Sequence, residues 1–364
     1  MQHRFGTSDP LTLGIEEELL LVDPGDLQLA HVAEEILGAV ELPESLAAHE
    51  AFASEIELRT PVCRDAGEAG RALDAARAAA RAAGATLMAA GLHPSARWGD
   101  VRLTEKERYR EIDQTMRSLI RRTPECALHV HVGAPSPEAA IRILNGLRVH
   151  LPLLQGLSAN SPYWFGADSG LASARFSIVR AYPRRGVPRF FHEWDEYAEI
   201  VRATGAAGAF DDYTFIWWDA RAHPKLGTVE VREMDVQSSL EDTAALAALV
   251  HALAAQALES GPAGPHLPAE AIGESSFRAS RDGLDATILH DGALRPLRDV
   301  ARTTVESVAG HARELGSDDA LAGVERILRE GGGATRQRAA AQRGGLDELL
   351  AQLVRDTEAP AWPT

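Results

Sequence analysis

The sequence predicts an α+β fold, with a sheet-bearing core over residues 10–240 and a mainly helical part over residues 241–364 packed on that core. Two observations predict it. Segments of the first two thirds alternate apolar and polar residues with the two-residue period of β-strands, and helix-like segments stand between them. From about residue 240 the pattern becomes mainly helical. Because no long polar linker separates the two parts, we expect a single domain over residues 1–364.

The strands are expected where short alternating segments occur, at residues 11–23, 54–61, 126–134 and 227–235. Residues 66–90 are rich in alanine and arginine, which favours a helix. Ser136 and Pro137 are expected as the N-cap and first residue of a helix over 136–150, which continues beyond this range with a bend at Pro152. Further helices are expected at residues 241–260, 292–315, 318–330 and 343–356, with a connector at 261–268.

The overall composition limits the class of partner. The chain has 37 basic and 53 acidic side chains and a net charge of −16, which argues against nonspecific nucleic-acid binding. Its two cysteines, Cys63 and Cys126, form no CxxC pair, so a thiolate zinc site is not expected. The first residues lack a signal-peptide pattern, and no segment approaches the ~18 apolar residues of a membrane span. We expect a cytoplasmic protein that binds small molecules rather than nucleic acid or membrane; a homo-oligomer stays open.

Four of the expected strands have one apolar face and one face of charged or metal-binding side chains. In the first strand Glu16 and Glu18 share a face, whereas Glu17 points the other way among leucines. We expect Glu17 to lie at a strand edge or to pair with an arginine of the helix at 66–90. The same alternation in the other strands groups Glu55, Glu57 and Arg59, then His129 and His131, then Glu230 and Arg232. Each group alone is more often a solvated face, but four such strands in one sheet favour a common site.

If these faces meet, carboxylates and imidazoles crowd together, and like charges at close range require a cation. A cluster rich in oxygen and free of cysteine suits Mg²⁺ or Mn²⁺ better than structural zinc. Such ions usually keep a phosphate ligand, so the pattern points to nucleotide chemistry.

Residues 157–186 contribute arginines whose guanidinium groups match phosphate and carboxylate oxygens. They are Arg175, Arg180, Arg184 and Arg185, with solvated surface residues as the alternative, and the last two beside Gly186 are expected at the surface. Trp217 and Trp218 precede Arg221, and we expect both tryptophans to be structural, with one in the core and the other in a pocket wall as the alternative. No GxxxxGK[ST], GxGxxG or GxSxG motif occurs.

Five stretches together resemble the carboxylate–amine ligase family, also called the glutamate–cysteine ligase type 2 family. They appear in the family's order as "GIEEELLLVD", "EIELRTP", "HVHVG", "LSANSPYWFG…SGLASARF" and "WWDARAHPKLGTVEVREMD". The stretch "GGGATRQR", residues 331–338, resembles the family's C-terminal signature. Taken by itself, this stretch is expected to be a helix connector, with a mobile basic loop that closes on a ligand as the alternative.

The resemblance implies a glutamine-synthetase-like antiparallel sheet that forms an open funnel, with helices on its outer face. It implies binding of ATP with Mg²⁺ or Mn²⁺, and ATP-dependent joining of a carboxylate, typically glutamate, to an amine such as that of cysteine. Arg175 and Arg232 are implied as catalytic groups, and Arg180 and Arg221 complete the expected cofactor-binding arginines. The implied metal ligands are Glu16, Glu18, Glu50, Glu57, His129, His131 and Glu230.

The expected reaction has two steps. The carboxylate attacks the γ-phosphate of ATP to form an acyl phosphate, and an amine then displaces phosphate to leave an amide. A metal-dependent hydrolase and a non-catalytic nucleotide-binding regulator are the alternatives. The hydrolase explains the clustered glutamates and histidines but not the arginines.

Overall fold

The computed structural model describes residues 1–261 and 266–361. Its main sheet is open and entirely antiparallel, in the order β2-β3-β1-β5-β9-β8, with β4 paired to part of β1. The strands are β1 Leu13–Leu21, β2 Ala47–His49, β3 Glu55–Arg59, β4 Leu87–Met88, β5 Leu128–Gly133, β8 Ala220–His223 and β9 Thr228–Val231. Two small hairpins join β6 Tyr163–Trp164 to β7 Ala167–Asp168 and β10 Thr287–His290 to β11 Ala293–Pro296.

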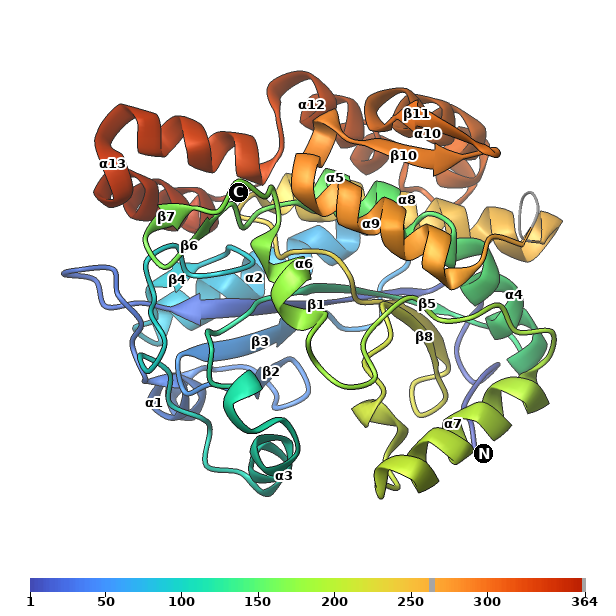
Figure 1. The fold of residues 1–364 in the computed structure, drawn as a ribbon, viewed down its shortest axis with the longest axis horizontal. Helices are drawn as coiled ribbons and strands as arrows, with labels where there is room; N and C mark the ends of the chain where they lie inside the picture. Colours follow the sequence, from blue (N-terminus) through green and yellow to red (C-terminus); the bar gives the residue numbers. More distant parts are fainter. Residues whose placement is uncertain (262–265, 362–364) are drawn as a thin grey trace.

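Helices cover both sides of the sheet, and the C-terminal ones lie together along one side (Figure 1). The N-terminal helices are α1 Ala33–Ala39, α2 Ala66–Ala82, α3 Glu107–Met116, α4 Pro137–Arg148, α5 Leu151–Ser158, α6 Ala174–Val179 and α7 Trp194–Gly208. The later helices are α8 Leu240–Ser260, α9 Ala269–Asp282, α10 Leu297–Glu314, α11 Asp318–Leu321, α12 Gly323–Glu330 and α13 Gly333–Glu358.

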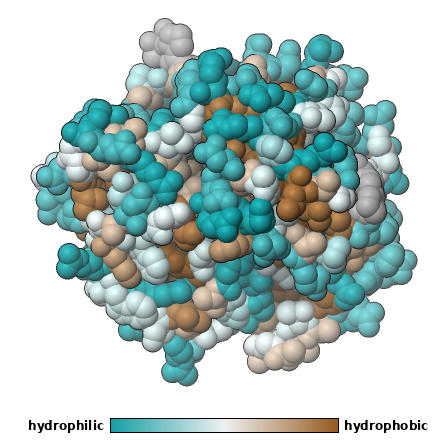
Figure 2. Space-filling model, turned by 45° about the horizontal axis from the view of Figure 1, so that its top comes forward, coloured by the Kyte–Doolittle hydropathy of each residue, from teal (hydrophilic) through white to brown (hydrophobic). Residues whose placement is uncertain are grey.

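The apolar face of the sheet forms the largest core. Leu13 and Ile15 of β1 and Val130 of β5 pack in one cluster with Leu144 of α4 and Leu249 of α8. Helix α8 is long and apolar enough to cross a membrane by composition, but it is mostly buried inside the fold. The face of the molecule in Figure 2 is largely hydrophilic, with small hydrophobic areas between. The apolarity of α8 is therefore that of a central core helix.

The register of the sheet aligns the polar faces of its strands. Glu18 lies opposite Glu57 of β3, and Glu16 lies opposite His129 of β5. On the far side of β5, His131 lies opposite Glu230 of β9. Because directly opposed residues point to the same face, the alternation predicted from the sequence converges on one side of the sheet.

The start of α4 is as predicted. The hydroxyl of Ser136 accepts a hydrogen bond from the Ala139 amide at 3.1 Å, and Pro137 occupies the first helical position. The expected bend at Pro152 is instead a break: α4 ends at Arg148, and Pro152 lies in the first turn of α5. A proline in a first turn loses no helical hydrogen bond, which favours a new helix start there.

Other boundaries differ from the prediction. The helix expected over 66–90 ends at Ala82, and Leu87–Met88 form β4 against β1. The helix expected from 292 begins at Leu297, because residues 293–296 belong to a hairpin. Helix α9 was not predicted, and the connector at 261–268 lies partly outside the described residues. Helix α13 starts at Gly333, ten residues before the predicted start, and is kinked at Gly344 and Gly345.

Candidate active site

A cavity of about 360 Å³ lies over the polar face of the sheet. Its floor consists of side chains from β1, β3, β5 and β9, including the acids and histidine predicted from alternation. The opposite wall contains Tyr109, Ile112 and Met116 of α3, with Tyr182 from the loop after α6 and Trp217 from the segment before β8. The cavity therefore combines a charged floor with a partly apolar wall.

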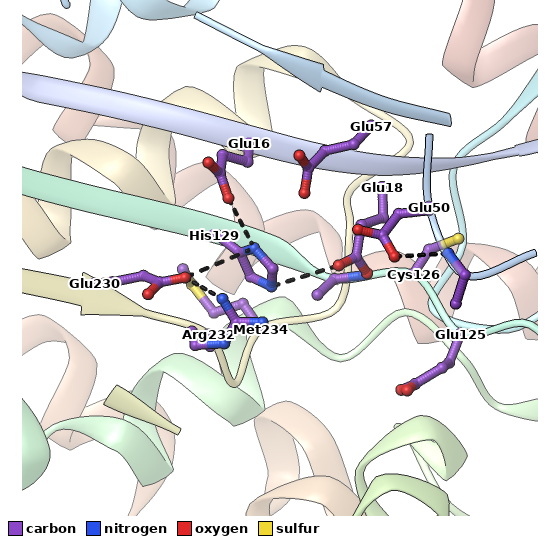
Figure 3. Close-up of polar contacts among 12 residues, drawn as sticks. Glu16, Glu18, Glu50, Glu57, Glu125, Cys126, His129, Glu230, Arg232 and Met234 are labelled. Carbon is purple, nitrogen blue, oxygen red and sulfur yellow. Dashed lines mark hydrogen bonds and ion pairs between the residues drawn. The ribbon is translucent and has the colours of Figure 1, made fainter. Parts of the chain in front are cut away.

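His129 stands at the centre of two potential metal-binding groups, which share its imidazole. Its Nδ1 atom lies 3.2 Å from Glu16 Oε2 and 4.0 Å from Glu230 Oε1, and its Nε2 atom lies 3.6 Å from Glu18 Oε1 (Figure 3). One group is Glu16, His129 and Glu230, the other Glu18, Glu57 and His129, and the ligand atoms of each lie within 4.8 Å of one another. Two cations could thus bind on either side of one imidazole.

The protonation of these side chains fits cation ligands. Burial lowers the pKa of His129 to about 3, so its nitrogens are free of an extra proton. Burial and neighbouring Glu57 raise the pKa of Glu18 to about 8, and burial and Glu18 raise that of Glu50 to about 8. Burial also raises the pKa of Glu57 well above its usual value. Burial and mutual repulsion thus keep these carboxylic acids protonated. A divalent cation bound among them would displace their protons and be held by the resulting carboxylates.

Glu16 and Glu230 differ from these acids. Burial opposes the ionisation of Glu16, but His131 and His129 hold its pKa well below the usual value. Arginines surround Glu230: burial opposes its ionisation too, but Arg221 and Arg232 hold its pKa well below the usual range. Arg221 Nε donates to Glu230 Oε2 at 2.6 Å, and Arg232 Nη1 donates to Oε1. Both guanidinium groups line the cavity, so positive charge lies directly beside the first metal group.

Comparison with known proteins decides the family. Residues 12–356 match the sequence model described as "Glutamate-cysteine ligase family 2(GCS2)". The chain belongs to this family. The resemblance seen in the GCS2 motifs is therefore confirmed, and membership of a ligase family favours the ligase over the hydrolase and the regulator.

Individual relatives agree with the GCS2 assignment. The chain is 44% identical over 369 residues to a Rubrobacter xylanophilus protein named "Putative glutamate--cysteine ligase 2-1", covering 98% of this chain and 97% of that one. It is 35% identical to the "Glutamate--cysteine ligase" of Haloquadratum walsbyi, covering 95% of this chain and 96% of that one. A solved glutamate–cysteine ligase structure from Francisella tularensis, in complex with AMP, has TM-score 0.73 at 13% identity over 96% of this chain and 89% of that one. This match confirms the predicted fold class.

The GCS2 chain brings most of the predicted site residues to the cavity. Glu16, Glu18, Glu50, Glu57, His129, Arg175, Arg221, Glu230 and Arg232 all line it. His131 lies just outside: its Nδ1 atom is 3.0 Å from the Thr228 hydroxyl, and its Nε2 atom is 3.6 Å from Glu16. Arg180 is not among the lining residues, and its guanidinium pairs with Asp219 at 2.8 Å.

Two expectations near the cavity wall have different outcomes. Arg185, expected at the surface, is buried in the cavity wall, where its Nε atom lies 3.3 Å from Asp219. This expectation was wrong because Arg185 is buried together with Asp219, whose negative charge offsets the cost of burying the guanidinium. Asp219 is distant in the sequence, so the pairing could not be foreseen. Of the two alternatives for the tryptophans, the structure supports one in the core and one in the pocket wall, because Trp217 lines the cavity and Trp218 packs against the core.

The sequence interpretation missed several lining residues of this GCS2 site. They include Glu125, whose Oε2 atom lies 3.6 Å from Arg175 Nε, and Tyr109, Tyr182 and Arg108 of the opposite wall. Glu125 immediately precedes the histidine strand, which was its one available signal. The sequence contained no signal for the lining residues of α3, because helical periodicity does not reveal that the helix faces the polar side of the sheet.

The third glutamate of the opening strand is also explained. Glu17 is fully buried on the apolar face, and its Oε1 atom lies 2.8 Å from Arg77 Nη2 of α2. The expected pairing with an arginine of the helix at 66–90 is therefore correct.

Proposed function

We propose that this protein is an ATP-dependent carboxylate–amine ligase that uses Mg²⁺ or Mn²⁺ and forms an acyl-phosphate intermediate. The observation that carries the proposal is the pair of potential metal groups sharing His129, bordered by Arg221 and Arg232 in one cavity. Two adjacent cations and flanking guanidiniums suit the charge of a triphosphate. The AMP complex of the Francisella ligase supports nucleotide binding in the same fold.

Each group of residues has a defined task in the proposed reaction. The two acid groups around His129 would hold the cations, which would neutralise charge on the phosphate oxygens. Arg232 and Arg175 would stabilise the phosphoryl group while the substrate carboxylate attacks it and ADP leaves. An amine would then displace phosphate from the acyl carbon to give the amide. Glu50 and His131 would support the cation sites from their edges.

The proposed substrates are glutamate as the carboxylate and cysteine as the amine. The names of the Rubrobacter and Haloquadratum relatives support this pair. We further propose that the sheet core and C-terminal helices form one catalytic domain acting on small molecules in the cytoplasm. The metal-dependent hydrolase gains no support from the cavity, because hydrolysis by a metal-bound water gives no role to its arginines.

A coupled assay of ADP release over a panel of carboxylates and amines tests the function. We expect ADP release that requires a divalent cation and both organic substrates, and amide formation in equal amounts. Glu16→Gln and Glu230→Gln should each lower turnover by roughly 100-fold or more, the scale of losing one key electrostatic group. Product without ATP would support the hydrolase. ATP binding without ADP release over the whole panel would support the regulator, and near-wild-type turnover in both variants would remove the metal assignment.

A further inference from the structure

The signature stretch Gly331–Arg338 lies outside the cavity: Gly331 and Gly332 connect α12 to α13, and the remaining residues form the first turns of α13. Its polar side chains contact three separate parts of the chain. Arg336 pairs with Asp242 of α8, and Arg338 pairs with exposed Asp168 of the β6–β7 hairpin. Gln337 alone of the three is buried. It is the residue that connects this stretch to the interior.

Gln337 holds Asn160, a fully buried residue after α5. Its Nε2 group donates to both the backbone oxygen and the side-chain Oδ1 of Asn160, each at 2.8 Å. The approach is close enough to require glycine at residue 333, since a Cβ atom there would lie 2.1 Å from Asn160 Oδ1. The glycine and glutamine of the signature therefore serve the same contact.

Asn160 in turn contacts the buried carboxylate of Asp235, which follows β9. The backbone N–H of Asn160 donates to Asp235 Oδ2 at 2.9 Å, and the Ser161 hydroxyl donates to the same atom at 2.7 Å. The Ser173 hydroxyl donates to Oδ1 at 3.0 Å. Hydrogen bonds from residues 160–161 and from Ser173 therefore hold both oxygens of the Asp235 carboxylate in place.

Asp235 fixes one edge of Arg175. Arg175 Nη1 lies 3.5 Å from Asp235 Oδ1 and donates to the Glu233 carbonyl at 3.1 Å. The opposite edge of the guanidinium faces Glu125 in the cavity lining: Arg175 Nε forms an ion pair with Glu125 Oε2 at 3.6 Å but, among the described residues, donates no hydrogen bond. An arginine anchored on one edge, with an N–H that donates no hydrogen bond on the other, is suited to receive an anionic group.

We propose that Gln337, Asn160 and Asp235 are positioning residues that set Arg175 in the active site. The signature stretch would then contribute to catalysis from outside the cavity, through the buried hydrogen bonds of these three positioning residues and the ion pair between Asp235 and Arg175. The catalytic role of Arg175 rests on the proposed function, whereas its placement by Gln337 does not. Displacing a catalytic group by about 1 Å can lower the reaction rate on the order of 100-fold.

The test compares Gln337→Met with Arg338→Met, the same replacement at the next residue, in the ADP-release assay. We expect Gln337→Met to lower kcat by about 10- to 100-fold with a smaller change in the KM for ATP. Arg338→Met should stay within about twofold of wild type, because it breaks an ion pair with an exposed partner. Gly333→Ala should reproduce the loss and Gly332→Ala should not, since only the first meets Asn160. This second pair keeps the test valid if Gln337→Met does not fold.

A double-mutant cycle separates positioning from a general loss of structure. If Gln337 acts through Arg175, Gln337→Met should change turnover by less than about twofold in an Arg175→Met background. Additive losses would overturn the proposal. Crystal structures of Gln337→Met and Gly333→Ala give a readout that does not depend on the reaction: we expect Arg175 to be displaced. An undisplaced Arg175 would contradict the positioning role, whereas a wild-type enzyme without ligase activity would contradict only the proposed function.

Discussion

Glu17 and Glu18 are neighbours in β1 whose side chains point to opposite faces of the sheet. Glu18 faces the cavity with its raised pKa, whereas Glu17 accepts hydrogen bonds from Arg77 at 2.9 and 2.8 Å and from Thr243 at 2.9 Å. Arg77 is fully buried and donates its other hydrogens to three backbone carbonyls. A buried ion pair of this kind contributes little net stability, but removing one partner leaves an uncompensated charge.

The two glutamates should therefore give opposite phenotypes when each is replaced by glutamine. Glu17→Gln should lower the free energy of unfolding by about 3–5 kcal/mol, because Arg77 keeps its charge, and should leave turnover per folded molecule largely intact. Glu18→Gln should keep or raise stability, since burial already holds this carboxyl group largely uncharged at neutral pH, and lower turnover by roughly 100-fold. Denaturant unfolding and ADP release measure the two effects. The same phenotype in both variants would contradict the assignment of faces.

What could be predicted of single residues followed from local periodicity. Alternation placed Glu16 and Glu18, Glu57, and His129 on the polar faces of their own strands, and the structure brings these residues into one cavity. The environment of Arg185 could not be predicted, because it depends on Asp219, which reaches it only in the folded chain. Local periodicity relates only residues that are near one another in the sequence, so it cannot predict this pair.

Among the helices, α4 has the clearest start signal. The Ser136 hydroxyl caps the Ala139 amide, and the helix packs on β8, β9 and α8 away from the cavity. Ser136→Ala should therefore lower the free energy of unfolding by about 1 kcal/mol without changing turnover. Ser307→Ala is the matched control: Ser307 is exposed within α10, where alanine is the better helix former, and its replacement should be neutral or stabilising. Equal losses of stability in both variants would contradict the capping role.

Element boundaries were predicted less well than element types. Long periodic helices such as α8 were found, but the two-residue β4 was not, because a strand so short has no period of its own. The sequence did contain a signal for the β10–β11 hairpin, the pair Asp291–Gly292 at its turn. In the structure both residues have positive φ, 49° and 76°. An Asp-Gly pair between apolar residues favours such a turn. The register of β1 against β3 and β5 could not be predicted from any one strand, yet it determines the geometry of the two potential metal-binding groups.

At the scale of the molecule, the fold gathers many acids in one cavity of a chain whose net charge is −16. Glu18 and Glu50 have folded-state pKa values of about 8, raised from 4.5 chiefly by burial. Between these values the folded protein retains protons that the unfolded chain has lost, so stability must fall as pH rises. Burial lowers the pKa of His129 and His223 to about 3, which has the opposite effect only below about pH 6.5.

In the range from pH 6.5 to 8 the response therefore comes mainly from buried acids with raised pKa values, Glu18 and Glu50 in the cavity and Glu233 beside its lining residue Arg232. We expect the melting temperature of the metal-free protein to fall over this range, and the raised pKa of His131 acts in the same direction. Added Mg²⁺ should stabilise the protein more at pH 8 than at pH 6.5, because a cation must displace the carboxyl protons in order to bind. Calorimetric scans at both pH values, with and without Mg²⁺, measure both effects. A Glu18→Gln, Glu50→Gln double variant should flatten the pH dependence and lose most of the stabilisation by Mg²⁺. An equal response to Mg²⁺ in this variant and in wild type would place the cation elsewhere on the acidic surface.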